Sequence, residues 1–215
     1  MQPRLSSKRN AAMTLFEVGV IVAVVLVLAV IFLSRTASKF SPEAVCINNQ
    51  KQIALAYKLW AGDNNDTLPM GISVTNGGAL ELIATGNVVS VFQVMSNELS
   101  TPKILVCPAD ARSEALDFPR LAHTNLSYFV GLDFTNDANP QIILSGDTHL
   151  EFAGLPVKPG IRALAQNDPV GWSSSRHQRT GNLGFTDGSV QTANSNQLHN
   201  FLRSTGVTTN RFALP

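Results

Sequence analysis

Residues 18–33 read VGVIVAVVLVLAVIFL, sixteen positions without a charge, and this stretch decides how the chain is organised. The apolar run extends back to Met13, with only Thr14 and Glu17 interrupting it. As a helix, residues 13–33 would be about 31 Å long at roughly 1.5 Å per residue, which is enough to cross a bilayer. A secretory signal has an apolar region of only about 7–15 residues and ends at a small-residue cleavage site, whereas Ser34 and Arg35 follow here. The pattern predicts a transmembrane helix.

Basic residues gather before this helix, where they bear on its orientation. Arg4, Lys8 and Arg9 precede it, whereas the other 13 basic residues are outnumbered by 15 acidic ones. Positive charge tends to stay on the cytoplasmic side of a membrane segment, so we expect a cytoplasmic N-terminus and an exported C-terminal part. Arg35 and Lys39 beyond the helix weaken that asymmetry. The formal net charge is only +1, which gives no broad field for attracting nucleic acid, and we expect no nucleic-acid partner.

A second helix is expected from Pro42 to about Trp60. Ser41 offers a capping hydroxyl and Pro42 suits the first helical turn. The apolar face that should pack on the head is made of Cys46, Ile53, Tyr57 and Trp60, with Gln50 and Lys51 interspersed. Pro42 either separates the two helices or kinks a single one, and we favour a kinked or briefly interrupted long helix.

The remainder of the 215 residues suits one globular head. After Gly62, turn residues recur between short apolar runs, which predicts a loop-rich β or α+β head. The expected strands are Ile104–Cys107, Ser127–Val130, Gln141–Leu144, Leu183–Thr186 and Val190–Thr192. The expected short helices are Ala79–Ile83, Val89–Leu99 and Asn196–Leu202.

Glu17 is an ionisable group at the start of the apolar segment, where an unpaired charge costs roughly 2.5–3.5 kcal/mol. One interpretation is that it stays solvated at the headgroup boundary. In the other, the chain is cut between Ala12 and Met13, and the new α-ammonium of Met13 then lies within one helical turn of Glu17. The two charges would neutralise each other, either within one chain or between neighbouring subunits, where the pairing would set the stagger of packed helices.

Residues 12–17, Ala-Met-Thr-Leu-Phe-Glu, together with the apolar run resemble the cleavage and methylation site of type IV prepilins and type II secretion pseudopilins. In that family the mature chain usually begins Phe-Thr-Leu with Glu as its fifth residue, whereas here Met13 replaces the aromatic residue and Ala12 the usual glycine. The resemblance implies cleavage between Ala12 and Met13, N-methylation of Met13, and a role for Glu17 in recruitment and packing. It also implies an α+β, pilin-like fold in which a long N-terminal helix, transmembrane in its first half, packs on an antiparallel β-sheet head with a loop-rich C-terminal region.

The resemblance divides the chain into a basic leader at 1–12, a transmembrane and filament-core helix at 13–40 and an exported head at 41–215. It implies a structural, non-enzymatic subunit of a type IV pilus-like filament or a type II secretion pseudopilus. The implied location is the bacterial inner membrane, with a periplasmic or cell-surface filament after assembly. The implied partners are a prepilin peptidase/N-methyltransferase, other pilin or pseudopilin subunits, an inner-membrane assembly platform and the lipid bilayer. The alternatives are a single-span, membrane-anchored binding protein and a tethered hydrolase with an extracytoplasmic head.

The C-terminal part also resembles a subgroup of large bacterial prepilin-like proteins. That subgroup carries a His, nine residues and then Asp-Gly, matched here by His177 and by Asp187 with Gly188. The Asp-Gly pair also fits a tight type I′ hairpin turn, which needs no chemistry. We expect His177 to stabilise the fold through a contact with Asp187 or the hairpin rather than to bind a metal. Further segments that match the subgroup are residues 46–56, 63–64, 68–69 and 106–108.

Cys46 and Cys107 match no zinc-binding pattern. If the head is exported, a disulfide between them is favoured over two free thiols. An enzyme would need one of them as nucleophile and His177, His123 or His149 as base, but no protease or transferase signature surrounds either cysteine.

Two oxygen-rich stretches are candidates for calcium. One holds Asp63, Asn65 and Asp66, and the other is an expected loop at Gly146-Asp147. Neither has the glycine and terminal glutamate of an EF-hand loop, so we expect no cofactor and keep calcium as the alternative.

Overall fold

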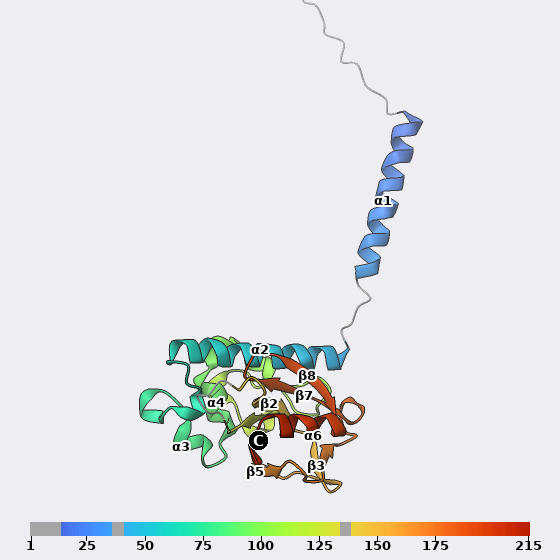
Figure 1. Cartoon of the computed structure of the whole chain (residues 1–215). Helices are drawn as coiled ribbons and strands as arrows, with labels where there is room; N and C mark the ends of the chain where they lie inside the picture. The colour runs from blue at the N-terminus through green and yellow to red at the C-terminus, as the bar shows by residue number, and fades with distance from the viewer. Residues whose placement is uncertain (1–13, 36–40, 134–138) are drawn as a thin grey trace, which may run out of the picture. The chain divides into compact units, whose positions relative to one another are not determined.

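The computed structural model describes residues 14–35, 41–133 and 139–215, and the chain divides into two units, residues 1–40 and 41–215 (Figure 1). The first unit contains helix α1, Leu15–Arg35, and the side chains described along it, up to residue 30, are exposed. Within the part of the chain that the structure describes, no helix is long and apolar enough to cross a membrane. The predicted kink or break before Pro42 falls on residues 36–40, outside the described residues.

The second unit begins with helix α2, Pro42–Asp63, and the prediction of this helix is confirmed. Ser41 caps it, because its Oγ accepts a hydrogen bond of 3.2 Å from the amide of Ala44. The predicted apolar face is buried as expected, and Gln50, which lies within that face, is fully buried with it. The buried residues of α2 are Cys46, Asn49, Gln50, Ile53, Ala54, Ala56, Tyr57 and Trp60.

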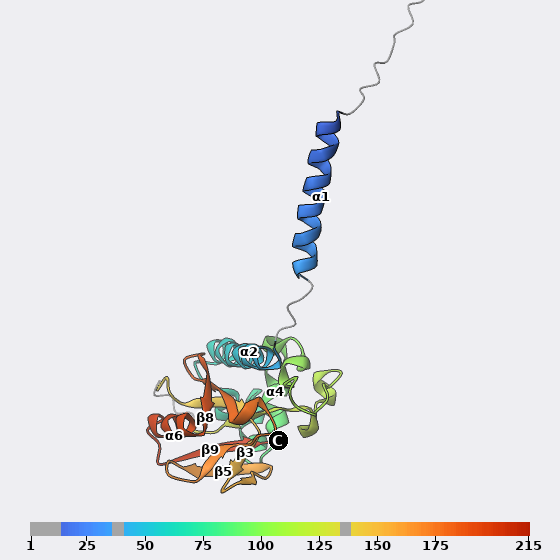
Figure 2. The same ribbon diagram turned by 90° about the vertical axis from the view of Figure 1, so that its right-hand side faces the viewer.

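The head is α+β with an antiparallel sheet, as predicted, and this sheet has six strands. The strand order is β5-β9-β1-β2-β7-β8, where the strands are β1 Tyr128–Gly131, β2 Ile143–Asp147, β5 Gly160–Ala165, β7 Thr180–Phe185, β8 Val190–Asn194 and β9 Thr209–Leu214. A smaller sheet has the order β4-β3-β6, from Leu155–Pro156, Leu150–Phe152 and Val170–Trp172. Helix α2 runs across one side of the head and β3 lies at the opposite side (Figures 1 and 2).

Two hydrophobic cores lie on opposite faces of the large sheet. In β1, Tyr128 and Val130 join the core under α2, whereas Phe129 joins the core that contains the smaller sheet and helix α6, Ser195–Ser204. A register shift in β2 between Ile143 and Ser145 turns Ser145 toward α2. There the Ser145 hydroxyl donates a hydrogen bond of 2.6 Å to Gln50 Oε1, so a buried polar pair fixes where the helix sits on the sheet.

The short elements correct two predictions. The expected strand Ile104–Cys107 is wrong, because a 3₁₀ turn, η3 Pro102–Leu105, occupies this segment; Pro102 presets its φ, and Thr101 Oγ1 accepts from the amide of Lys103. The expected helix Val89–Leu99 is interrupted at Met95. The helices here are α3 Leu80–Ile83, α4 Val88–Val94 and α5 Ser96–Leu99. The other 3₁₀ turns are η1 Pro69–Gly71, η2 Val74–Asn76, η4 Phe118–Arg120, η5 His123–Asn125 and η6 His177–Arg179.

Strands β3, β4, β5, β6 and β9 were not predicted. The largest omission is β9, which lies inside the sheet between β5 and β1. Its sequence, TNRFAL, places Arg211 beside the buried Phe212, so it shows neither a long apolar run nor strict alternation. Its position depends on pairing with strands that are distant in sequence.

Helix α2 is tied to the segment after η3 by a covalent bond and a hydrogen bond. Cys46 and Cys107 form a disulfide with an S–S distance of 2.11 Å, which closes a separation of 61 residues. One turn further along α2, Asn49 Nδ2 donates to the carbonyl of Val106 at 3.0 Å. Both cysteine side chains are fully buried.

Replacing both Cys46 and Cys107 with alanine should lower the free energy of unfolding by about 2–4 kcal/mol, because the unfolded chain regains the freedom of a long loop. Urea unfolding of the full chain in detergent, followed by tryptophan fluorescence, measures the change. A reductant should destabilise the parent chain and leave the double variant unaffected. Equal stability of parent and variant would contradict a stabilising bridge.

Candidate functional site

The described part of the predicted processing and assembly site is a capping box at the start of α1. Glu17 Oε2 accepts hydrogen bonds from the amide of Thr14 at 2.8 Å and from its hydroxyl at 3.0 Å. In return, the amide of Glu17 donates to Thr14 Oγ1 at 3.3 Å. Reciprocal bonds of this kind satisfy amides that have no partner at the start of a helix. Ala12 and Met13 lie outside the described residues.

Only one oxygen of Glu17 takes part in this capping. No described residue donates a hydrogen bond to Oε1. Phe16, Val20 and Ile21 line an open hollow of about 380 Å³ together with Glu17. The carboxylate therefore has a free oxygen beside an apolar surface, an arrangement that can accept a cationic group arriving together with an apolar side chain.

His177 lies against the disulfide and not against the hairpin. Its Nε2 is 3.2 Å from Cys107 Sγ, and since a disulfide sulfur carries no proton, the ring nitrogen must be the donor. His177, Gln178 and Arg179 all have positive φ, at 49°, 53° and 65°. Three consecutive left-handed residues cost roughly 1–2 kcal/mol each. The surrounding contacts must hold this strained turn in place, and Thr180 Oγ1 donates to the His177 carbonyl at 2.6 Å.

The predicted contact of His177 with Asp187 is wrong. The two residues lie at opposite ends of β7, Thr180–Phe185, and six extended residues span roughly 20 Å. Asp187 Oδ1 instead accepts from the amide of Ser189 at 2.7 Å, and its carbonyl accepts from Lys58 of α2. The type I′ turn is also wrong, because only Gly188 of the pair has a positive φ, at 85°. The loop closes with Gly188 donating to the Phe185 carbonyl.

Next to His177, the head buries a charged cluster that the sequence did not reveal. Arg176 is 7% exposed, and its Nη1 lies 2.9 Å from Asp110 Oδ2. Its Nη2 donates to Thr148 Oγ1 at 2.7 Å. Asp110 also accepts from Ser127 Oγ at 2.8 Å. No motif spacing could have identified the cluster, because its members come from segments about positions 110, 127, 148 and 176.

Asp147 and His149 extend this cluster into the interior. Asp147 ends β2 and is fully buried, so the expected loop at Gly146-Asp147 is wrong. Its Oδ2 accepts from the amide and the side chain of Asn182 at 2.7 and 3.1 Å, while Oδ1 has no hydrogen-bond partner. Burial raises the pKa of Asp147, and the bonds from Asn182 and the charge of Arg176 oppose that rise.

His149 is held between two rings and a carbonyl. Its Nε2 is 2.8 Å from the carbonyl of Thr180, and its ring centroid lies 5.0 Å from that of Trp172 and 5.9 Å from that of His177. Burial, followed by the charge of Arg176, lowers the pKa of His149 to about 4. The imidazole is therefore neutral near pH 7, with Nδ1 buried and without a partner.

Among the described residues, one group of three His, Cys, Asp or Glu side chains converges closely enough for a metal ion, namely Cys46, Cys107 and His177. The two cysteines are bound to each other, so neither offers the thiolate that a metal or a covalent mechanism requires. The calcium candidates Asp63 and Asp66 are exposed and belong to no such group.

Comparisons of the chain with protein-family models, with curated proteins and with solved structures found no match. Function is therefore inferred from the residues and geometry of this chain. Ionisable side chains with unusual surroundings occur at two places described above. One is Glu17 on α1, and the other is the buried cluster that joins Arg176, Asp147 and His149 to the disulfide.

The low pKa of His149 should make the head lose stability in mild acid. The unfolded imidazole titrates near pH 6.5, so the stabilising contribution of the neutral ring is complete above that pH and is lost as pH falls toward 4, by at most about 3 kcal/mol. Asp147, with its raised pKa, acts in the opposite direction. The variant His149→Gln removes the titrating ring, while the glutamine amide can still donate to the Thr180 carbonyl and Asp147 is unchanged. Urea unfolding between pH 4 and 7 should show a free energy of unfolding that depends less on pH in this variant than in the parent. The same pH dependence in both would contradict the lowered pKa of His149.

Replacing Arg176 with methionine should destabilise the head by about 3 kcal/mol, because the mostly buried carboxylate of Asp110 then keeps only its longer ion pair with Arg112, whose Nε lies 3.9 Å from Asp110 Oδ2. The matched control is Arg120→Met. Arg120 pairs with Asp117 at 3.6 Å, but the two side chains are 68% and 45% exposed, so the expected loss is below about 1 kcal/mol. Chemical unfolding at pH 7 measures both variants, and equal losses would show that Arg176 contributes no more than a surface pair.

Proposed function

We propose that this chain is a structural, non-enzymatic subunit of a type IV pilus-like filament or a type II secretion pseudopilus. A prepilin peptidase cuts between Ala12 and Met13, and the new amine of Met13 is N-methylated. Helix α1 is held first by the inner membrane and then by neighbouring α1 helices in a filament core, while the head forms the surface. The observation that supports this most directly is a helix apolar on every side with one carboxylate near its start.

The exposed surface of α1 supports the proposal. Its large apolar side chains from Val18 to Leu28 are 45–61% exposed, on all sides of the helix. A helix that is apolar all round is stable in a membrane or against other helices, but not in water. The sequence continues the run without a charge to Leu33. In the bilayer, lipid would cover this apolar surface, and in a filament core the neighbouring helices would cover it.

The free oxygen of Glu17 supports the second part of the proposal. Thr14 engages Oε2, so Oε1 can accept the α-ammonium of Met13 from a neighbouring subunit. Methylation leaves that nitrogen cationic, so the attraction persists. Pairing would remove the cost of a lone charge in an apolar core, roughly 2.5–3.5 kcal/mol, and would fix the axial stagger between subunits.

The disulfide is consistent with an exported head. Structural disulfides persist in oxidising compartments outside the cytoplasm and are rare within it. The Cys46–Cys107 bridge is buried and joins α2 to the segment after η3, as expected of a structural bridge. Export of the head also agrees with the basic residues Arg4, Lys8 and Arg9 before α1.

Two substitutions separate the charge of Glu17 from its capping role. Glutamine serves as well as glutamate at the third position of a capping box, so Glu17→Gln removes the charge and keeps the helix start. Thr14→Ala removes the cap, at about 1 kcal/mol, and keeps the charge. We expect Glu17→Gln to abolish sheared filaments recovered by sedimentation and Thr14→Ala to retain them.

The same samples test the processing step. Mass spectrometry of the membrane form should show a chain that begins at a methylated Met13 in the parent and in both variants. An intact Met1 in the parent chain would contradict processing and favour a single-span binding protein. If processing occurs and both variants assemble equally well, Glu17 is a capping residue and not an assembly residue.

A further inference from the structure

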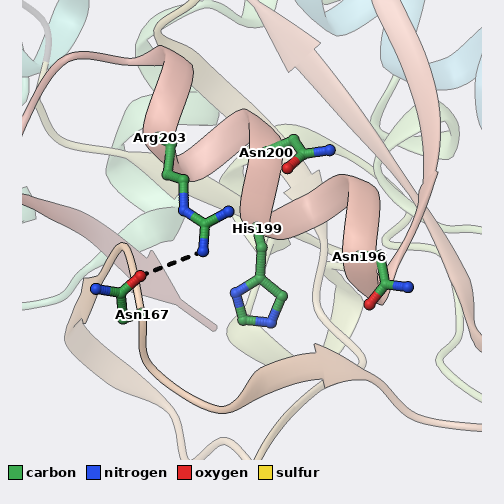
Figure 3. Close-up of a pocket in the computed structure, with 5 residues that line it drawn as sticks. All are labelled: Asn167, Asn196, His199, Asn200 and Arg203. Atoms are coloured by element: carbon green, nitrogen blue, oxygen red, sulfur yellow. Dashed lines mark hydrogen bonds between the residues drawn. The ribbon is translucent and has the colours of Figure 1, made fainter.

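The outer face of α6 and the loop between β5 and β6 line an open, polar surface pocket of about 350 Å³ (Figure 3), and four of its five lining residues are exposed. Helix α6 buries Leu198 and Leu202 on its opposite face. Arg203 points from the helix toward Asn167, which the β5–β6 loop carries, and the ring of His199 projects from the same helix beside it (Figure 3). The lining residues are Asn167, Asn196, His199, Asn200 and Arg203.

The positive charge in this pocket is not neutralised by a carboxylate. Arg203 Nη2 donates to Asn167 Oδ1 at 3.2 Å, and no described acidic residue forms an ion pair with the guanidinium. The nearby Asp168 does not line the pocket, and its Oδ2 accepts from the amide of Ala165. An amide thus orients the guanidinium without cancelling its charge, which leaves most of its donors available.

The other lining groups restrict the ligand further. Asn167, Asn196 and Asn200 each offer both a donor and an acceptor, which matches hydroxyl groups that also do both. No carboxylate is present to hold a cation, and no Trp, Tyr or Phe is present to stack on a nucleobase. Because the hollow is open to solvent and lined only by polar side chains, a bound molecule would stay partly hydrated, which suits a small hydrophilic ligand.

We propose that this pocket binds a small acidic sugar, with its carboxylate or phosphate on Arg203 and its hydroxyl groups on the asparagine amides. A guanidinium matches both oxyanions because its parallel N–H groups can bind two oxygens at once. The site lies entirely within the head, so it does not depend on whether the chain assembles into a filament.

A purely structural role for Arg203 predicts different behaviour. The residue lies in the last turn of α6, where any cation is favoured by the helix dipole. Lysine would serve that role equally well but lacks the planar fork of the guanidinium. Arg203→Lys therefore separates the two roles, while Arg179→Gln removes a charge from an exposed residue outside the pocket lining.

Isothermal titration of the full chain in a polyoxyethylene detergent tests the proposal with glucuronate, glucose 6-phosphate, glucose and inorganic phosphate. We expect saturable binding of glucuronate, glucose 6-phosphate or both, and the stronger of the two identifies the oxyanion. Arg203→Lys should weaken that binding about tenfold, equivalent to roughly 1.4 kcal/mol, without changing the thermal midpoint. Arg179→Gln should bind as the parent does.

Four results would overturn the proposal. In the first, neither acidic sugar binds. In the second, glucose binds as tightly as the acidic sugars, which shows that the charge plays no part. Inorganic phosphate binds as tightly as the sugars, which removes the role of the amides. Binding that Arg203→Lys leaves unchanged and Arg179→Gln weakens would show general electrostatic attraction in place of a site, because lysine keeps the positive charge and glutamine removes one.

Discussion

Burial of one face of α2 against the six-stranded sheet is the constraint on which the head depends. Ile53, Tyr57 and Trp60 supply the apolar area, but apolar contact alone tolerates sliding of a helix along a sheet. The hydrogen bond from Ser145 to Gln50 and the disulfide from Cys46 to Cys107 remove that freedom at two points along the helix. The register shift in β2 is what brings Ser145 to this face, so an irregularity in the sheet contributes to specificity.

Fixing α2 also determines where the buried charges lie. Cys107 is bonded to Cys46 of α2, and His177 contacts Cys107. The adjacent Arg176 pairs with Asp110 and donates to Thr148 in the interior. The left-handed turn from His177 to Arg179 costs energy by itself and is held by these contacts. The disulfide, the strained turn and the ion pair therefore stabilise one another. Substitutions at any two of them should change the free energy of unfolding non-additively.

Local signals in the sequence predicted what depends on local physics. Ser41 and Pro42 indicated the start of α2, and the spacing of Cys46, Ile53 and Tyr57 indicated its buried face. Turn residues between short apolar runs indicated a loop-rich β or α+β head, and its antiparallel sheet was implied by the resemblance alone. Strand β9, the buried ion pair of Arg176 and the contact of His177 depend on segments far apart in the sequence, which no local pattern encodes. The motif formed by His177 and Asp187 predicts a contact that the structure does not contain, because the six residues of β7 hold its two ends apart.

The capping box at Thr14 and Glu17 bears on why a charge stands at the start of an apolar helix. Capping alone does not require it, because glutamine satisfies the same amides and carries no charge into an apolar environment. An ionised carboxylate is costly there unless a cation meets it, and the capping geometry leaves one oxygen ready for such a partner. The amine released by cleavage before Met13 would lie at the same depth as that oxygen. Capping and the proposed assembly are therefore compatible uses of one side chain, in which Thr14 holds the carboxylate in position and the second oxygen would receive the neighbouring subunit.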